Sequence, residues 1–470
     1  MAQVKTAAAP GVAQVSVIAP AALGATAIAA LAARGIVARV AAADGIVAED
    51  IVAWALEAAP GPAAAVEIAA ACARAATAGR PICVLAPAPR GITRVAIERS
   101  AALSYLRAHG AALAHDVDAW LEAVVMIVRH GVPTGPRAAV VAPPGSWLEA
   151  QVSAIASEAE LGPRTNLVDH EAPTDVLLYD ASLPPPTHLA TVIAVPVAAR
   201  GELAVAGGEV PLHGARAALA AVAVLGRAAE RMAVGLGPAR ADAAAELGID
   251  EERLRRQLAK LATEPRLGDH ETKVLLAAYG VPITRQAVAT TPSAAVKLAR
   301  RAGYPVEVKP WGHDLPPESA GCPVEKHVTS DALVRAAFTS VLAAVGRGSV
   351  EGAAVIVRET PPVGRELAVS LLRLPALGWT VVLESPGATQ IAAAPAPLRL
   401  IDAQTLAAQV LASRAGEGDV DRAGLANLLR RASHLVADLG DRLASLELTR
   451  IVIGGRGSRT LVVDAHIELR

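Results

Sequence analysis

Aromatic side chains are scarce: they make up 2% of the 470 residues, and Phe338 is the single phenylalanine. The hydrophobic fraction is nonetheless 53%, and much of it is alanine. Alanine buries little area per residue, so we expect cores in which helices pack closely through small side chains. The 5 tryptophans are scattered singly along the chain. This spacing indicates isolated core or interface anchors and excludes an aromatic platform for stacking nucleic-acid bases.

The chain has no excess of either charge and little cysteine. Its 44 basic and 45 acidic residues give a net charge of −1, without a basic cluster, so a nucleic-acid partner is not expected. The three cysteines, Cys72, Cys83 and Cys322, form no C-x-x-C pair, which argues against a zinc site and a disulfide framework. Such usage fits a reducing compartment, and we expect a cytoplasmic protein.

A long uncharged run covers Val15 to Ala33 and raises the question of a membrane span. Pro20, Gly24 and the dominance of alanine over leucine favour a buried strand, a turn and a helix instead. Residues 1–13 lack the pattern of a signal peptide, and we interpret them as a flexible leader. No membrane association is therefore expected.

At about 150 residues per domain, the length predicts about three domains. Short apolar runs alternate with segments of helical periodicity, which is typical of parallel α/β units. In the first unit we predict strands at residues 14–19, 37–41, 63–68 and 82–86 and a closing helix at 117–129. In the second we predict strands at 138–142, 175–179 and 191–195 and helices at 147–158 and 216–231, and a charged connecting helix follows within residues 248–262.

The most informative stretch runs from Glu271 to Lys309. It predicts a short helix that ends at Gly280, a strand through residues 281–283, a helix over residues 293–302 and a strand that carries Lys309. Further on, the segment VEGAAVIVRETPPVGRELAVSLL has two apolar runs around a hinge, with Glu359 and Glu366 at its edges.

These two stretches resemble the ATP-grasp domain of the NDP-forming acyl-CoA synthetases, which are relatives of succinyl-CoA synthetase. Three earlier segments, QVSVIAPAALGATAIAALAARGI, HGAALAHDVDAWLEAVVMI and EVPLHGARAALAAVAVLGRAAER, are similar to the start and the end of that family's second domain and to the end of its third. The resemblance covers nearly the whole chain. The CoA-binding domain with which the family usually begins has no counterpart in this sequence.

The resemblance implies an α/β fold with two flavodoxin-like, doubly wound parallel-sheet domains followed by an ATP-grasp-like α+β domain. The expected boundaries are 1–13 for the leader, 14–134 and 135–235 for the flavodoxin-like domains, 236–264 for a helical linker and 265–470 for the ATP-grasp-like domain.

Four residues fall on positions that carry ligands in the family. The resemblance implies that Lys309 contacts ATP phosphates, that Glu359 and Glu366 lie at the nucleotide hinge, and that Asp464 in VVDAHIEL holds a metal ion. For each glutamate a structural ion pair is the alternative.

Other family motifs are altered. No histidine lies between Met1 and Leu106, where the family keeps its phosphorylated histidine, and the nearest substitutes, His109 and His115, are better interpreted as ordinary histidines. We therefore assign no catalytic residue. The loop that bears lysine and histidine in the family is here Pro316-Pro317-Glu318-Ser319.

The metal-binding strand of the family is altered as well. Thr449 and Ile451 replace its two Mg2+ ligands, Arg450 adds a positive charge, and Glu384 stands in the phosphate loop. ATP or ADP remains an expected ligand, whereas these changes put the binding of Mg2+ and CoA in doubt.

Two further motifs have plain structural interpretations. Residues 454–457 read as a hairpin turn rather than an anion site, and Asp269-His270-Glu271 reads as helix capping rather than a metal triplet.

The main functional hypothesis is a degenerate acyl-CoA synthetase-like protein that acts as a regulatory or scaffolding subunit and binds a nucleotide, an acyl-CoA or a partner protein. The alternative is an active ADP-forming acid–thiol ligase subunit that a partner chain completes. A third hypothesis is a purely structural assembly protein. Family members commonly assemble, so a homo-oligomer or a protein partner is expected.

Overall fold

The computed structural model describes residues 14–43, 50–157, 166–167, 174–186, 192–199, 209–239, 247–260, 266–348, 350–385, 391–411, 420–455 and 458–470. The expected leader, residues 1–13, and parts of the expected linker lie outside these ranges. The chain divides into two compact units. Unit 1 comprises residues 1–89 and 98–237, and unit 2 comprises residues 90–97 and 238–470.

Unit 1 contains two five-stranded parallel sheets. The first has the strand order β2 (Ala38–Val40), β1 (Val15–Ile18), β3 (Ile51–Ala55), β4 (Cys83–Leu85) and β5 (Ala112–Ala114). The second has the order β10 (Leu212–His213), β9 (Ile193–Ala198), β8 (Val176–Asp180), β6 (Arg137–Val141) and β7 (Asn166–Leu167). The two sheets share one strand order. Read from β2 in the first sheet and from β7 in the second, the strands of each sheet follow one another as second, first, third, fourth and fifth in the chain.

Unit 1 has six described helices. They are α1 (Ala21–Ala32), α2 (Pro62–Thr77), α3 (Arg94–Ala108, whose first four residues are grouped with unit 2), α4 (Val117–Arg129), α5 (Trp147–Ser157) and α6 (Ala215–Val234). At α4, the Asp116 carboxylate accepts a hydrogen bond from the backbone N–H of Ala119, which satisfies a donor that the helix leaves free. The run from Val15 to Ala33 is indeed a strand, a turn and a helix. Within the described residues, no helix is long and apolar enough to cross a membrane.

One apolar core joins the two sheets of unit 1. Helices α4 and α6 pack against each other and each touches strands of both sheets. Trp120 and Val124 of α4 and Leu219 and Val222 of α6 are all completely or almost completely buried in this core. Burial of these apolar side chains stabilises both sheets at once.

Unit 2 contains two antiparallel sheets. The six-stranded sheet has the order β11 (Arg266–Leu267), β20 (Leu461–Leu469), β19 (Leu443–Ile453), β16 (Arg365–Leu374), β17 (Gly378–Glu384) and β18 (Ala392–Pro395). The four-stranded sheet has the order β12 (Gln286–Ala289), β15 (Ala354–Glu359), β13 (Val306–Trp311) and β14 (Glu325–Val328).

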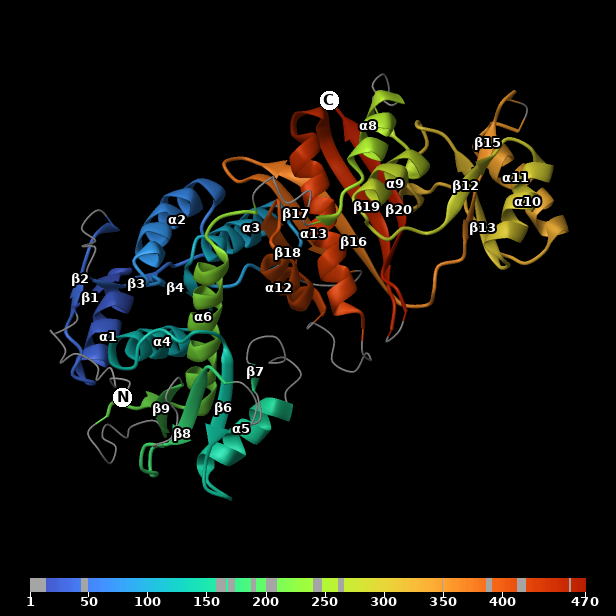
Figure 1. The fold of residues 1–470 in the computed structure, drawn as a ribbon. Coiled ribbons are helices and arrows are strands. Elements are labelled where there is room, and N and C mark those ends of the chain that lie inside the picture. Colours follow the sequence, from blue (N-terminus) through green and yellow to red (C-terminus); the bar gives the residue numbers. More distant parts are fainter. Residues whose placement is uncertain are drawn as a thin grey trace. The chain divides into compact units, whose positions relative to one another are not determined.

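Each sheet of unit 2 has its own core and its own helices (Figure 1). Helices α10 (Pro292–Ala302) and α11 (Asp331–Ala344) pack on the four-stranded sheet. Helices α9 (Asp269–Ala278), α12 (Leu400–Leu411) and α13 (Arg422–Leu439) pack on the six-stranded sheet, against which α8 (Glu251–Lys260) adds Leu254 and Leu258. Two short 3-10 turns, η4 (Glu318–Ala320) and η5 (Gly440–Arg442), complete the described elements.

Two predictions of secondary structure are wrong. Residues 63–68, predicted as a strand, lie in α2, because Gly61 and Pro62 start a helix and the alanines that follow favour it. The strand of that region is β3, which the sequence analysis did not find. Ile283, also predicted in a strand, makes only an isolated bridge with Val462.

The close approach of α6 to the start of the second sheet generates a prediction. A Cβ atom on Gly226 would overlap the backbone of Gly135 and Pro136. We expect Gly226→Ala to lower the free energy of unfolding of unit 1 by about 1–3 kcal/mol, measured by urea denaturation.

The matched control is Gly24→Ala in α1. There a Cβ atom would meet its nearest neighbour, the Cβ of Ala19, at 3.7 Å, which is an ordinary contact. Because alanine favours a helix over glycine, this variant should be unchanged or more stable by up to about 1 kcal/mol. Equal midpoints for the two variants would contradict the packing argument.

Candidate functional site

Polar side chains occupy one face of the central strands in the four-stranded sheet of unit 2. Val306 and Val308 of β13 point into the core with α10 and α11. Because side chains alternate along a strand, Glu307 and Lys309 lie on the opposite face. Arg358 of β15 is the register partner of Glu307 and joins them there.

Lys309 is buried, with 3% of its surface exposed, and carboxylates surround its amine. Its Nζ lies 2.5 Å from Oδ1 of Asp464 and 3.3 Å from both Oδ2 of Asp269 and Oε1 of Glu318. Burial disfavours the charged amine, but Asp269 and Asp464 outweigh it, so the pKa of Lys309 lies above its ordinary value. Lys309 is therefore a fully paired cation.

Asp464 lies on β20 and is completely buried. Besides Lys309, its carboxylate accepts hydrogen bonds from the Thr449 hydroxyl at 2.7 Å and from the backbone N–H of Glu318 at 3.1 Å. Burial opposes ionisation, but nearby His466 and Lys309 outweigh it and hold the pKa of Asp464 well below its ordinary value.

Arg358 forms a second buried ion pair beside Lys309. Its guanidinium donates to Oε2 of Glu307 from Nε at 2.7 Å and to the carbonyl of Val463 at 2.9 Å. Its Nη1 also lies 2.5 Å from Oε1 of Glu318. Glu318 thus touches both Lys309 and Arg358.

Helix α9 supplies a third buried cation. Lys273 lies one turn after Asp269, with its Nζ 3.1 Å from Oδ1 of that residue, and donates to Thr284 at 3.0 Å and to Gln286 at 2.7 Å. Burial is the largest effect on Lys273 and lowers its pKa to about 8.

We name these groups the buried charge cluster. It contains three cations and four carboxylates and joins α9, β13, β15, β20 and η4. Its members are Asp269, Lys273, Glu307, Lys309, Glu318, Arg358 and Asp464.

The structure thus brings two of the four predicted site residues, Lys309 and Asp464, into direct contact. Glu366 lies at the margin, with 48% of its side chain exposed, and pairs with Arg450 at 2.8 Å. Glu359 is not in the cluster: it binds Arg285, through Nε at 2.5 Å and the backbone N–H at 2.9 Å. Both glutamates form the ion pairs that were the structural alternative.

Lys273, Glu307 and Arg358 were not predicted as site residues from the sequence. A signal for Glu307 was present, because it lies two residues before Lys309 and therefore on the same face of β13. Arg358 follows four apolar residues in β15. Asp269 was interpreted as a helix cap, which is wrong: the N-cap of α9 is Gly268, and the Asp269 carboxylate faces Lys273 and Lys309 instead.

The two histidines considered as catalytic substitutes have protein partners. His109 follows α3, and its Nδ1 lies 2.8 Å from the carbonyl oxygen of Tyr105; burial is the main reason that its pKa is lowered. His115 follows β5, with its Nδ1 2.8 Å from the carbonyl oxygen of Ala86 and its Nε2 2.9 Å from Nη2 of Arg107.

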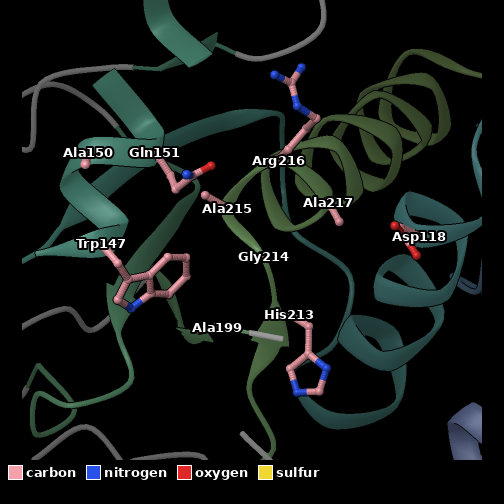
Figure 2. Close-up of a pocket in the computed structure, with 10 residues that line it drawn as sticks. All are labelled: Asp118, Trp147, Ala150, Gln151, Ala199, His213, Gly214, Ala215, Arg216 and Ala217. Atoms are coloured by element: carbon pink, nitrogen blue, oxygen red, sulfur yellow. The ribbon is translucent and has the colours of Figure 1, made fainter. Parts of the chain in front are cut away.

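A separate pocket lies in unit 1, with a volume of about 550 Å³ (Figure 2). It is bordered by the first turn of α6, the face of α5 with Trp147 and Gln151, and Asp118 of α4. His213 lines the pocket and also contacts Arg34, with its Nδ1 2.8 Å from Nη2 of that residue. The volume is in the range of small-molecule sites.

Comparisons with known proteins identify the class of unit 2. Residues 259–469 match the ATP-grasp domain family. Residues of this chain are 25% identical over 214 residues to the acetate–CoA ligase (ADP-forming) II subunit beta of Pyrococcus furiosus, with 43% of this chain and 91% of that protein covered. The chain thus carries an ATP-grasp domain homologous to the beta subunits of ADP-forming acyl-CoA ligases, which fits the NDP-forming acyl-CoA synthetase superfamily predicted from the sequence.

Two other relatives extend this comparison. The 4-hydroxybutyrate–CoA ligase (ADP-forming) of Nitrosopumilus maritimus is 25% identical over 222 residues, which cover 45% of this chain and 32% of that protein. A solved structure of the dinucleotide-forming acetyl-coenzyme A synthetase 1 of Ca. Korarchaeum cryptofilum, in complex with coenzyme A and Ca-AMPCP, is 27% identical and has a TM-score of 0.41, with 46% of this chain and 99% of that chain covered.

The lowered pKa of Lys273 generates a pH prediction. Between about pH 8 and the ordinary lysine value of 10.5, the unfolded chain binds one more proton at this residue than the folded chain. The contribution of Lys273 to the free energy of unfolding therefore rises with pH in this window, by about 1.5 kcal/mol from pH 8 to pH 9.5.

The measurement compares urea unfolding of the wild type and Lys273→Met at both pH values. The variant should lack the rise in free energy of unfolding that Lys273 contributes. Cysteines and tyrosines also titrate in this pH range, but they affect both proteins alike. An equal pH dependence in the two proteins would show that Lys273 does not titrate in this way.

Proposed function

We propose that this chain is an acyl-CoA ligase-like protein that serves as a nucleotide- or acyl-CoA-binding regulatory or scaffolding subunit. The observation that supports the proposal is the buried charge cluster. The family resemblance assigns Lys309 to ATP phosphates, yet its amine is already neutralised by three carboxylates. A lysine whose charge is fully paired within the protein stabilises the fold. It is poorly suited to neutralise the phosphates of ATP during phosphoryl transfer.

The same proposal includes the domain arrangement. Both parallel sheets have the strand order of flavodoxin-like folds, which favours two such domains over residues 14–134 and 135–235. The linker at 236–264 and the ATP-grasp-like domain at 265–470 complete the arrangement.

The residues fit a nucleotide only in part. Lys309 and Arg358 are suitable for phosphate oxygens, and ATP, when bound, would supply the phosphoryl group. For Mg2+, Asp464 offers a buried carboxylate, but Thr449 beside it offers a hydroxyl that donates to Asp464. Among the described residues, no three histidine, cysteine or acidic side chains are grouped to hold a metal ion. We therefore route no catalytic step through Mg2+.

A second candidate function is an active ADP-forming ligase subunit that a partner chain completes. It is favoured by the alignment with a beta subunit, which covers 91% of that protein. In this case the partner supplies the histidine and the CoA-binding domain, and Lys309 is released from its carboxylates when the nucleotide binds.

Calorimetric titration of the purified chain tests the first proposal. We expect heat of binding with ATP, ADP or CoA. For a nucleotide, Lys309→Met should weaken binding by about tenfold or more, because a charge-assisted contact to phosphate is lost. The control is Lys326→Met, which removes an exposed lysine from β14 of the same sheet. If none of the three ligands gives heat, the ligand-binding proposal fails and a structural assembly role remains.

Reconstitution tests the second candidate. The chain is mixed with a partner subunit that carries the family's CoA-binding domain and phosphorylated histidine, and acyl-CoA formation is measured with ATP and Mg2+. An active ligase predicts turnover that depends on the partner and disappears with Lys309→Met. Undiminished turnover of the folded variant would exclude a catalytic role for Lys309.

A further inference from the structure

Glu318 has an unusual place in the buried charge cluster. Its Oε1 atom lies 3.3 Å from Nζ of Lys309 and 2.5 Å from Nη1 of Arg358. An anionic oxygen that bridges a lysine and an arginine is the arrangement in which proteins commonly hold a phosphate. Here the bridging oxygen belongs to the protein itself.

The backbone holds Glu318 at this point. It begins the turn η4 directly after Pro317, and the turn ends at Gly321 with a φ of 95°, a conformation that favours glycine. The N–H of Glu318 donates to Asp464 at 3.1 Å. In this structure the backbone of Glu318 is thus bonded to Asp464, and its carboxylate contacts both cations.

Glu318 is also the most accessible member of this contact. Its side chain is 10% exposed, compared with 4% for Lys309 and 0% for Arg358. A third cation lies near its other oxygen, since Nη1 of Arg450 is 3.8 Å from Oε2 of Glu318 and the Arg450 side chain is 19% exposed. Arg450 therefore offers the carboxylate a neighbouring positive charge outside its contacts with Lys309 and Arg358.

We propose that Glu318 is an internal anion that occupies the phosphate position on Lys309 and Arg358, and that a nucleotide polyphosphate binds there only when Glu318 moves away. The inference rests on the proposed nucleotide-binding function and names the contact that regulates it. With Glu318 in place, the four carboxylates of the cluster balance its three cations and the neighbouring Arg450. A polyphosphate then meets no net attraction, and repulsion from Glu318 weakens its binding.

The decisive variant is Glu318→Gln, which keeps the size of the side chain and removes its charge. We expect its affinity for ATP to exceed that of the wild type by about tenfold or more, with a smaller gain for ADP and the smallest for AMP, because the repulsion that the variant removes grows with the charge of the phosphate chain. Binding is measured by calorimetry at two salt concentrations, and the gain should shrink at the higher one.

The matched control is Glu351→Gln, which removes an exposed carboxylate from the same unit. Glu318→Ala provides a second variant, and thermal unfolding of each protein shows that it is folded. An equal gain with Glu351→Gln would reveal a general charge effect and overturn the inference.

The outcomes also separate this inference from the proposed function. If the wild type binds ATP and neither Glu318 variant binds it more tightly, the internal anion is excluded while nucleotide binding stands. If neither the wild type nor the variants bind ATP, both the inference and the nucleotide part of the function fail. Binding of CoA alone would still support the acyl-CoA part.

Discussion

Unit 2 depends on charge balance between its two antiparallel sheets. A buried ion without a partner costs several kcal/mol, so each cation on β13, β15 and α9 requires a carboxylate within contact distance. Asp464 and Glu307 meet this requirement from the strands, and Asp269 meets it from the helix. The contact between Lys309 and Asp464 links the four-stranded sheet to the six-stranded sheet, and the apolar cores of these sheets are separate. Charged contacts are therefore part of the interface between the two sheets.

This constraint changes the meaning of the family resemblance. The resemblance to an ATP-grasp domain suggests a lysine at the position of Lys309 whose charge is available to bind phosphate. In this chain the charge of Lys309 is paired with neighbouring carboxylates. One of them is Glu318, from a loop whose sequence differs from the family's pattern. Homology with the beta subunits supports common descent and a ligase-like role, whereas the proposal for what the site binds rests on the local balance of charges.

The elements with strong periodicity could be predicted from the sequence. Helix α4 was predicted at its observed bounds, and Lys309 was placed correctly on its strand, because capping and alternation are local signals. Strand β3 and the start of α2 could not be separated, since alanine-rich segments carry little periodic contrast. The partners of Lys309 could not be predicted either. Asp269, Glu318 and Asp464 come from distant parts of the chain, and only the folded sheets place them together.

The core around α4 and α6 has a consequence for how unit 1 loses its structure. Each of these helices buries residues against both parallel sheets, so neither sheet retains a complete apolar interior without the other. Separation of the chain near residue 134 would leave two fragments with exposed helix faces, prone to aggregate. Residues 14–237 should accordingly melt as one cooperative body, even though the strand order divides them into two.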